Sequence, residues 1–143
     1  MVANTKPIQI VIDTNVLVSA YRSNRGMAYR LIGQMGNPRW EMNISTTLVL
    51  EYESALKREF KRQGRELALV DIALDYLIER AKRRNIFFRS RPLLSDPGDE
   101  FVLELAIASR ADFIVTYNIR DYRGTGAYGV NAVTPAQFLE VLE

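Results

Sequence analysis

The chain of 143 residues is 48% hydrophobic, carries a formal net charge of +2 and contains neither cysteine nor histidine. The missing cysteines exclude disulfides, thiol nucleophiles and thiolate metal sites, and the missing histidines exclude Ser-His-Asp triads and the usual zinc ligands. Any chemistry must therefore use carboxylates, hydroxyls, amides, lysine or arginine, and hard oxygen ligands favour Mg²⁺ or Mn²⁺. With no apolar run of about 18 residues and no signal-peptide pattern, we expect a cytoplasmic protein without a membrane span, folded as a single domain over residues 1–143.

Segments typical of strands and helices alternate along the chain. Apolar runs of strand length separate segments whose apolar residues recur at helical spacing, and residues 36–38 and Gly64 mark helix ends. In chain order we expect a strand at 8–12, helices at 15–22 and 26–36, a strand at 41–45, helices at 46–63 and 65–84, a strand at 86–88, a helix from 95–99 to about 110, strands at 112–116 and 130–133, and a helix from 135 to the end. This alternation predicts an α/β fold, a three-layer α/β/α sandwich whose central, mostly parallel sheet has four to five strands.

Side chains able to bind a cation follow each of the first four predicted strands. Asp13 ends the first, Glu51 lies in the second turn of the helix after the second, Asp99 in the first turn of the helix after the third, and Asn118 just beyond the fourth. The carboxyl ends of parallel strands share one edge of the sheet, where open α/β folds bind ligands. Glu51 and Asp99 also border the predicted buried faces of their helices, where a charge is costly unless paired or metal-bound. We therefore expect a divalent-metal site at this edge.

Each of these acids also has a purely structural interpretation. Asp13 could cap the helix that follows it, and Glu51 could pair with Arg58. Asp96 precedes a proline and fits a helix N-cap, in which case Asp99 would be the third helical residue, where a capping-box partner sits. Four separate structural roles at one edge are a less economical explanation than one site.

Further polar residues flank the predicted site. Thr14, Asn15 and Thr116 could orient the ligands or the water of a metal, or they could be ordinary turn and cap residues. Asp121, three residues beyond Asn118, is either a further metal ligand or a residue that holds the loop.

Positive charge is concentrated in one part of the chain. Residues 57–91 carry 11 of the 19 basic side chains against 5 acids, a local net charge of +6, so the rest of the chain sums to −4. A basic lobe beside an acidic pocket suits an enzyme that cuts a phosphodiester chain, although a solvated helix surface gives the same pattern. Arg83 and Arg84, near a predicted chain reversal, are the substrate-binding candidates. The tyrosines that could stack on bases are Tyr21, Tyr117, Tyr122 and Tyr128.

Three stretches carry recognisable motifs, namely IVIDTNVLVSA at 10–20, ISTTLVLEY at 44–52, and DPGDEFVLELA at 96–106 continued by ADFIVT at 111–116. In order and spacing they resemble the PIN-domain ribonucleases, and most closely the toxin components of bacterial and archaeal toxin–antitoxin systems. The resemblance implies a Mg²⁺- or Mn²⁺-dependent endoribonuclease that hydrolyses single-stranded RNA. It also implies an antitoxin protein as partner and a homodimer.

Carried over residue by residue, the resemblance makes Asp13, Glu51 and Asp99 the metal-binding catalytic acids. Many relatives place a fourth aspartate where this chain has Asn118, a neutral amide. The resemblance therefore leaves open whether one metal or two bind, and whether the residue that completes the site is Asn118, Asp121 or Asp96.

Two other functions remain open at this point. The first is a phosphatase of the haloacid-dehalogenase type, a class marked by the motif Asp-x-Asp after its first strand. This chain has Asn15 in place of the second aspartate. The second is a catalytically degenerate PIN-like domain that acts only as an RNA- or protein-binding module. Asn118 in place of an acid favours this second function.

Overall fold

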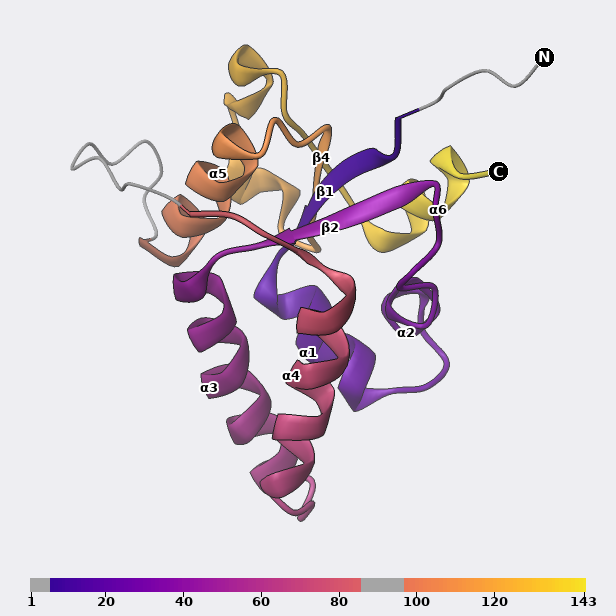
Figure 1. Cartoon of the computed structure of the whole chain (residues 1–143), viewed down its shortest axis with the longest axis vertical. Coiled ribbons are helices and arrows are strands. Elements are labelled where there is room, and N and C mark those ends of the chain that lie inside the picture. Colours follow the sequence, from indigo (N-terminus) through magenta and orange to yellow (C-terminus); the bar gives the residue numbers. More distant parts are fainter. Residues whose placement is uncertain (1–5, 86–96) are drawn as a thin grey trace.

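A computed structural model describes the backbone of residues 6–85 and 97–143 and the side chains of 6–85 and 100–143. The predicted strand at 86–88 and the residue Asp96 lie outside the described residues. Within them, a five-stranded sheet has the order β3-β2-β1-β4-β5, with every neighbouring pair parallel (Figure 1). The strands are β1 (Ile8–Ile12), β2 (Trp40–Ile44), β3 (Lys82–Arg83), β4 (Phe113–Val115) and β5 (Asn131–Val133).

Helices lie on both sides of this sheet (Figure 1). They are α1 (Thr14–Arg22), α2 (Met27–Ile32), α3 (Thr46–Arg62), α4 (Ala68–Arg80), α5 (Pro97–Ala108) and α6 (Pro135–Val141), with short 3₁₀ turns η1 (Ile119–Tyr122) and η2 (Thr125–Tyr128). Helix α5 contacts β1, β2 and β4, while α1, α3 and α4 pack against one another on the other side. The predicted α/β fold with a central parallel sheet is confirmed. Among the residues described, no helix is long and apolar enough to cross a membrane.

Local sequence explains where the long helix α3 begins and ends. The Ser45 side chain caps it by accepting a hydrogen bond from the Leu48 backbone N–H at 3.2 Å. Gly64 follows its last turn with a φ of +71°, a left-handed conformation that costs glycine little, and the chain reverses there. Both boundaries agree with the predicted helix at 46–63.

The third strand differs from its prediction. The helix expected at 65–84 ends at Arg80, and Lys82 and Arg83 instead pair with Asn43 and Ile44 of β2. Lysine and arginine favour a helix by intrinsic propensity, so the pattern gives no sign of a strand. Backbone hydrogen bonds to β2 nevertheless make this segment a strand at the edge of the sheet. Exposed charged side chains are typical of such an edge.

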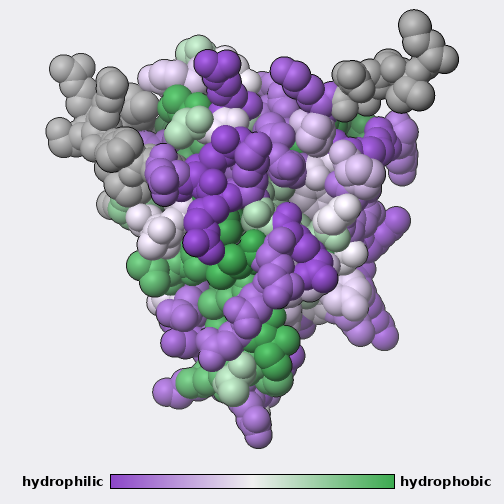
Figure 2. All heavy atoms as spheres, in the orientation of Figure 1, coloured by the Kyte–Doolittle hydropathy of each residue, from purple (hydrophilic) through white to green (hydrophobic). Residues whose placement is uncertain are grey.

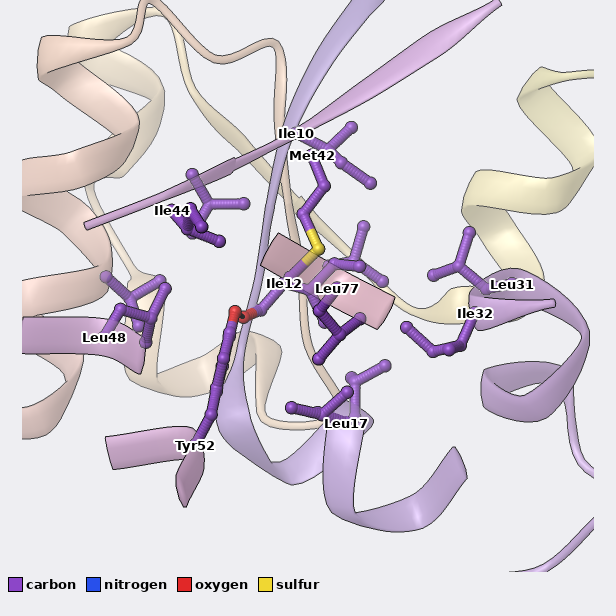
Figure 3. Close-up of a cluster of buried hydrophobic side chains, with 14 of the residues drawn as sticks. Ile10, Ile12, Leu17, Leu31, Ile32, Met42, Ile44, Leu48, Tyr52 and Leu77 are labelled. Carbon is purple, nitrogen blue, oxygen red and sulfur yellow. Dashed lines mark hydrogen bonds between the residues drawn. The ribbon is translucent and has the colours of Figure 1, made fainter. Parts of the chain in front are cut away.

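Buried apolar side chains hold β1 in the middle of the sheet. Ile10, Val11 and Ile12 are fully buried, and Figure 3 shows Ile10 and Ile12 among side chains from β2, α1, α3 and α4. Removing such a side chain costs about 2–5 kcal/mol, so the end of β1 is a rigid position. The residue that follows it is Asp13.

A buried carboxylate ties α1 to α3. Glu59 is 5% exposed and accepts hydrogen bonds from Arg22, Arg62 and Gln63. The bond from Arg62 is the main cause that lowers the pKa of Glu59 to about 2, with Gln63 and Arg22 acting in the same direction against burial. This cluster lies in the basic part of the chain and has a structural role.

Candidate active site at the carboxyl edge of the sheet

Asp13 occupies the point where β1 ends and α1 begins. It is 7% exposed, and its backbone N–H donates to the Val115 carbonyl at 2.9 Å, which fixes it against the end of β4. Asp13 does stand at the N-cap position of α1, but its side chain makes no capping hydrogen bond. The capping interpretation therefore does not account for the carboxylate.

Three donors instead converge on one oxygen of this carboxylate. Asp13 Oδ2 accepts hydrogen bonds from Thr116 Oγ1 at 2.8 Å, from the Tyr122 hydroxyl at 3.2 Å and from Asn15 Nδ2 at 3.4 Å. The Thr14 backbone N–H is a further donor to this carboxylate. The protein thus fixes the orientation of this carboxylate at the edge of the sheet where ligands bind.

Burial and a neighbouring charge make the ionised form of Asp13 costly. Burial is the largest cause that raises its pKa, the hydrogen bonds from Thr116 and Tyr122 oppose this, and the negative charge of Asp121 raises the pKa further. A cation beside a buried carboxylate removes this cost by favouring the charged form.

Glu51 reaches the same edge from the second turn of α3. The Thr14 hydroxyl donates to Glu51 Oε2 at 3.1 Å, so the residue after Asp13 positions the second acid. Arg58, the alternative partner for Glu51, instead donates Nη1 to the Ser54 hydroxyl at 3.0 Å.

Tyr52 connects the two acids, and the sequence analysis did not single it out. Its hydroxyl donates to the Ile12 carbonyl, and the ring is buried. Burial raises the pKa of this phenol well above its usual value, and the charges of Asp13 and Glu51 raise it further, so both carboxylates lie near it. Its place on the apolar stripe of α3, four residues after Leu48, was the signal that marked it as inward-facing.

The loop after β4 closes around Asp13. The Asn118 backbone N–H donates to Thr116 Oγ1 at 3.0 Å, and the Asn118 carbonyl accepts from the Asp121 N–H at 3.0 Å. The side chains of Asn118 and Asp121 are exposed at this edge. Tyr122, considered above as a base-stacking residue, is 2% exposed and is committed to Asp13, so that suggestion was wrong.

The remaining predicted acids are not placed. Asp99 belongs to the first turn of α5, but its side chain is not among those described, and Asp96 lies outside the described residues. Among the side chains that are described, no group of three carboxylates stands within reach of one metal ion.

The two candidate substrate-binding arginines have different surroundings. Arg84 Nε donates to the buried Asn43 side chain at 2.9 Å, so this arginine is built into the sheet. Arg83 is exposed, and its guanidinium makes no hydrogen bond or ion pair with the side chains described, those of residues 6–85 and 100–143.

The donor set fits a hard divalent cation. Asp13 Oδ1, Glu51 and the amide of Asn118 all offer oxygen, the ligand type of Mg²⁺ and Mn²⁺. A buried carboxylate whose ionised form is disfavoured by burial and by the charge of Asp121 is the feature of this structure that calls for a cation. The class of protein that the fold and site define is a parallel α/β domain with carboxylates at the carboxyl edge of its sheet.

Comparisons with known proteins identify the family within this class. A model of the PIN domain matches residues 9–120, so the chain belongs to the PIN-domain family. PIN domains are generally nucleases and usually use divalent metal ions, which makes this a domain of nuclease type.

A solved structure is also similar, a PilT N-terminus domain protein from the hyperthermophilic archaeon Sulfolobus solfataricus. It has a TM-score of 0.53 and 17% sequence identity, with 94% of this chain and 92% of that chain covered. At this identity the likeness supports the fold. Comparison with curated proteins gives no match.

Proposed function

We propose that the protein is a Mg²⁺- or Mn²⁺-dependent endoribonuclease that hydrolyses single-stranded RNA. The arrangement of Asp13 carries this proposal, because three side-chain donors fix Oδ2 of a buried carboxylate at the ligand-binding edge of the sheet. Membership of a nuclease-type family supplies the reaction class.

In this proposal Asp13, Glu51 and Asp99 would hold the cation. When bound, such a cation lowers the pKa of an attacking water and stabilises negative charge on the phosphate. The chain's own part is orientation: Thr116, Tyr122 and Asn15 fix the Asp13 carboxylate, and Thr14 fixes Glu51. Asn118 and Asp121 are exposed beside the site, and either can complete the ligand set.

Cleavage of a mixed single-stranded RNA in Mg²⁺, Mn²⁺ or EDTA tests the proposal. Wild type should cut in at least one metal and stop in EDTA, and Asp13→Asn should be inactive but folded. Asp75→Asn is the matched control, because Asp75 is an exposed acid on α4, away from the carboxyl edge. If folded wild type cuts no RNA in either metal, the degenerate binding module becomes the better interpretation.

We also propose that this nuclease is the toxin of a toxin–antitoxin pair whose antitoxin protein covers an apolar groove. A groove of about 400 Å³ runs between α1, α2, α3 and α4, and its floor and walls include Tyr29, Ile72 and Tyr76. Ile72 is 66% exposed and Tyr29 is 49% exposed, which is costly without a partner. Arg65 lines the groove and Arg80 stacks on Tyr76, so an amphipathic helix with acidic flanks is complementary to it.

The substitution Ile72→Glu tests this second proposal. It should abolish neutralisation by a cognate antitoxin while leaving RNA cleavage intact, because the groove is separate from the acids. Analytical ultracentrifugation of the chain alone tests the homodimer that the sequence resemblance implies. A dimer that Ile72→Glu dissociates would assign the groove to a second copy and contradict the antitoxin assignment.

A further inference from the structure

A second hollow lies at the carboxyl edge of the sheet, beside the candidate acids. It has a volume of about 220 Å³ and is here named the edge pocket. Its apolar wall consists of Ile44, Val49, Leu50 and Ile78, and its polar rim of Ser45, Thr46 and Arg83. Leu50 directly precedes Glu51 in α3, so the pocket adjoins the second acid in the chain.

Strand register places the edge pocket relative to Asp13. Ile10 pairs with Met42 and Ile44 pairs with Arg83, so the ends of β1, β2 and β3 stand level. Neighbouring strands are about 4.8 Å apart, so Arg83 stands about 10 Å from the end of β1, where Asp13 lies. A nucleic-acid strand bound at Asp13 can reach the pocket without leaving the edge.

The chemistry of the edge pocket suits one nucleotide. Aliphatic side chains can pack against the face of a base, and the exposed Thr46 at the rim offers a hydroxyl that can hydrogen-bond a ribose. Arg83 presents a guanidinium that no described residue engages, and this planar group matches a phosphate. The neighbouring Arg84 faces Asn43 instead, so only the first of the two arginines points into the pocket.

Packing of the fold explains the other three residues of the apolar wall but not the exposure of Leu50. Leu50 is 59% exposed, although it lies at the edge where the charged site is built. Figure 2 shows hydrophobic side chains over α3 and α4, on the face turned to the viewer, among hydrophilic neighbours. An apolar wall beside a cation is the combination that single-stranded nucleic-acid sites use, with stacking for the base and charge for the backbone.

We propose that the edge pocket binds the base of the nucleotide next to the cleaved phosphodiester, with Arg83 on a backbone phosphate. This inference rests on the proposed ribonuclease function and extends it, because it names the residues that select the position of the cut. Arg83 and Leu50 are positioning residues in this proposal, and the acids remain the catalytic ones.

Binding of a labelled single-stranded RNA tests the phosphate contact. Fluorescence anisotropy is measured in EDTA with Asp13→Asn as the parent, so that no cleavage occurs. Arg83→Ala should weaken binding about tenfold at low salt and reduce the slope of log K against log salt by about 0.7. Arg39→Ala is the matched control, because Arg39 is an exposed arginine at the opposite end of β2 and should change neither quantity. Equal effects of the two substitutions would overturn the assignment.

An abasic scan tests the base contact. In the parent, removing the base at one position of the RNA should weaken binding more than removal elsewhere. Leu50→Asp should abolish that difference, Leu50→Gln should reduce it, and Ile72→Asp on α4 should leave it unchanged. In otherwise wild-type protein with metal, Leu50→Asp should also redistribute the positions of cleavage. Thermal unfolding shows whether each variant is folded. If Leu50→Asp does not fold, Leu50→Gln replaces it in both measurements.

The two proposals fail in different ways. If substitution of Arg83 and Leu50 changes neither the RNA affinity nor the positions of cleavage, the nuclease proposal stands and the edge-pocket proposal is refuted. Binding that depends on both residues, in a wild type that cuts nothing, supports the pocket and contradicts the nuclease.

Discussion

Replacing Thr116 with valine measures how the fold holds Asp13. The Thr116 side chain is fully buried, and its hydroxyl donates to Asp13 Oδ2 over 2.8 Å while accepting from the Asn118 N–H over 3.0 Å. Valine keeps the shape and removes both hydrogen bonds. Since a hydrogen bond to a charged group contributes about 1.5–3 kcal/mol, we expect the free energy of unfolding to fall by about 2 kcal/mol in urea titrations.

The same substitution should move the pH dependence of cleavage. The Thr116 hydrogen bond lowers the pKa of Asp13, against the burial that raises it, so losing the bond raises the pKa. Because the ionised carboxylate would hold the cation in the proposed nuclease, the acidic limb of kcat/KM should shift to higher pH. Loss of a group that orients a metal ligand typically costs about 10–100-fold in metal affinity or activity.

Thr116→Ser is the matched control. It keeps the hydroxyl and removes one methyl group, a loss of about 1 kcal/mol in a packed site, so its pH profile should match wild type. A Thr116→Val protein with wild-type stability and an unshifted profile would refute the reasoning. So would a Thr116→Ser protein with the same shifted profile, because packing rather than the hydrogen bond would then hold Asp13.

Two further predictions concern stability. In metal-free buffer near pH 7, Asp13→Asn should unfold at a higher temperature than wild type, because burial raises the pKa of Asp13 and disfavours its ionised form. This advantage should disappear below pH 3.8, where the Asp13 carboxyl is protonated in both the folded and the unfolded protein. A large loss of stability would contradict this. Glu59→Gln should cost about 1.5–3 kcal/mol at neutral pH by weakening the bonds from Arg22 and Arg62. Since the pKa of Glu59 falls from 4.5 to about 2 on folding, the wild-type advantage should be complete above pH 4.5 and shrink towards pH 2, as followed by circular dichroism.

Much of the fold followed from local patterns. The apolar run at 8–12, the helix from Thr46 and the helix from Pro135 were all predicted, because burial and capping leave direct traces in the sequence. The exception was the strand at Lys82–Arg83, whose cause is backbone pairing with β2. Backbone hydrogen bonds at a sheet edge are made by every residue type and leave no side-chain signature.

The candidate site was predictable in part. The positions of Asp13 and Glu51 followed from the rule that parallel strands end at one edge, and Thr116 was expected beside them. The roles of Tyr52 and Tyr122 could not be predicted, because the sequence does not show which group a buried hydroxyl meets once the elements pack. Tyr122 meets Asp13 at a sequence separation of 109 residues, and Tyr52 meets Ile12 at a separation of 40.

The sequence by itself determined the chemistry that is open to this protein and the elements that carry it. Lacking cysteine and histidine, the chain had only hard oxygen ligands to offer a metal, and its periodicity placed Asp13 at the end of a buried strand. Only the tertiary structure decided which side chains surround that carboxylate. The order β3-β2-β1-β4-β5 sets β4 beside β1 and β3 beside β2, which brings Thr116 to Asp13 and leaves Arg83 at the rim of the edge pocket. Strand order depends on packing between distant segments, and a repeating local pattern does not encode it.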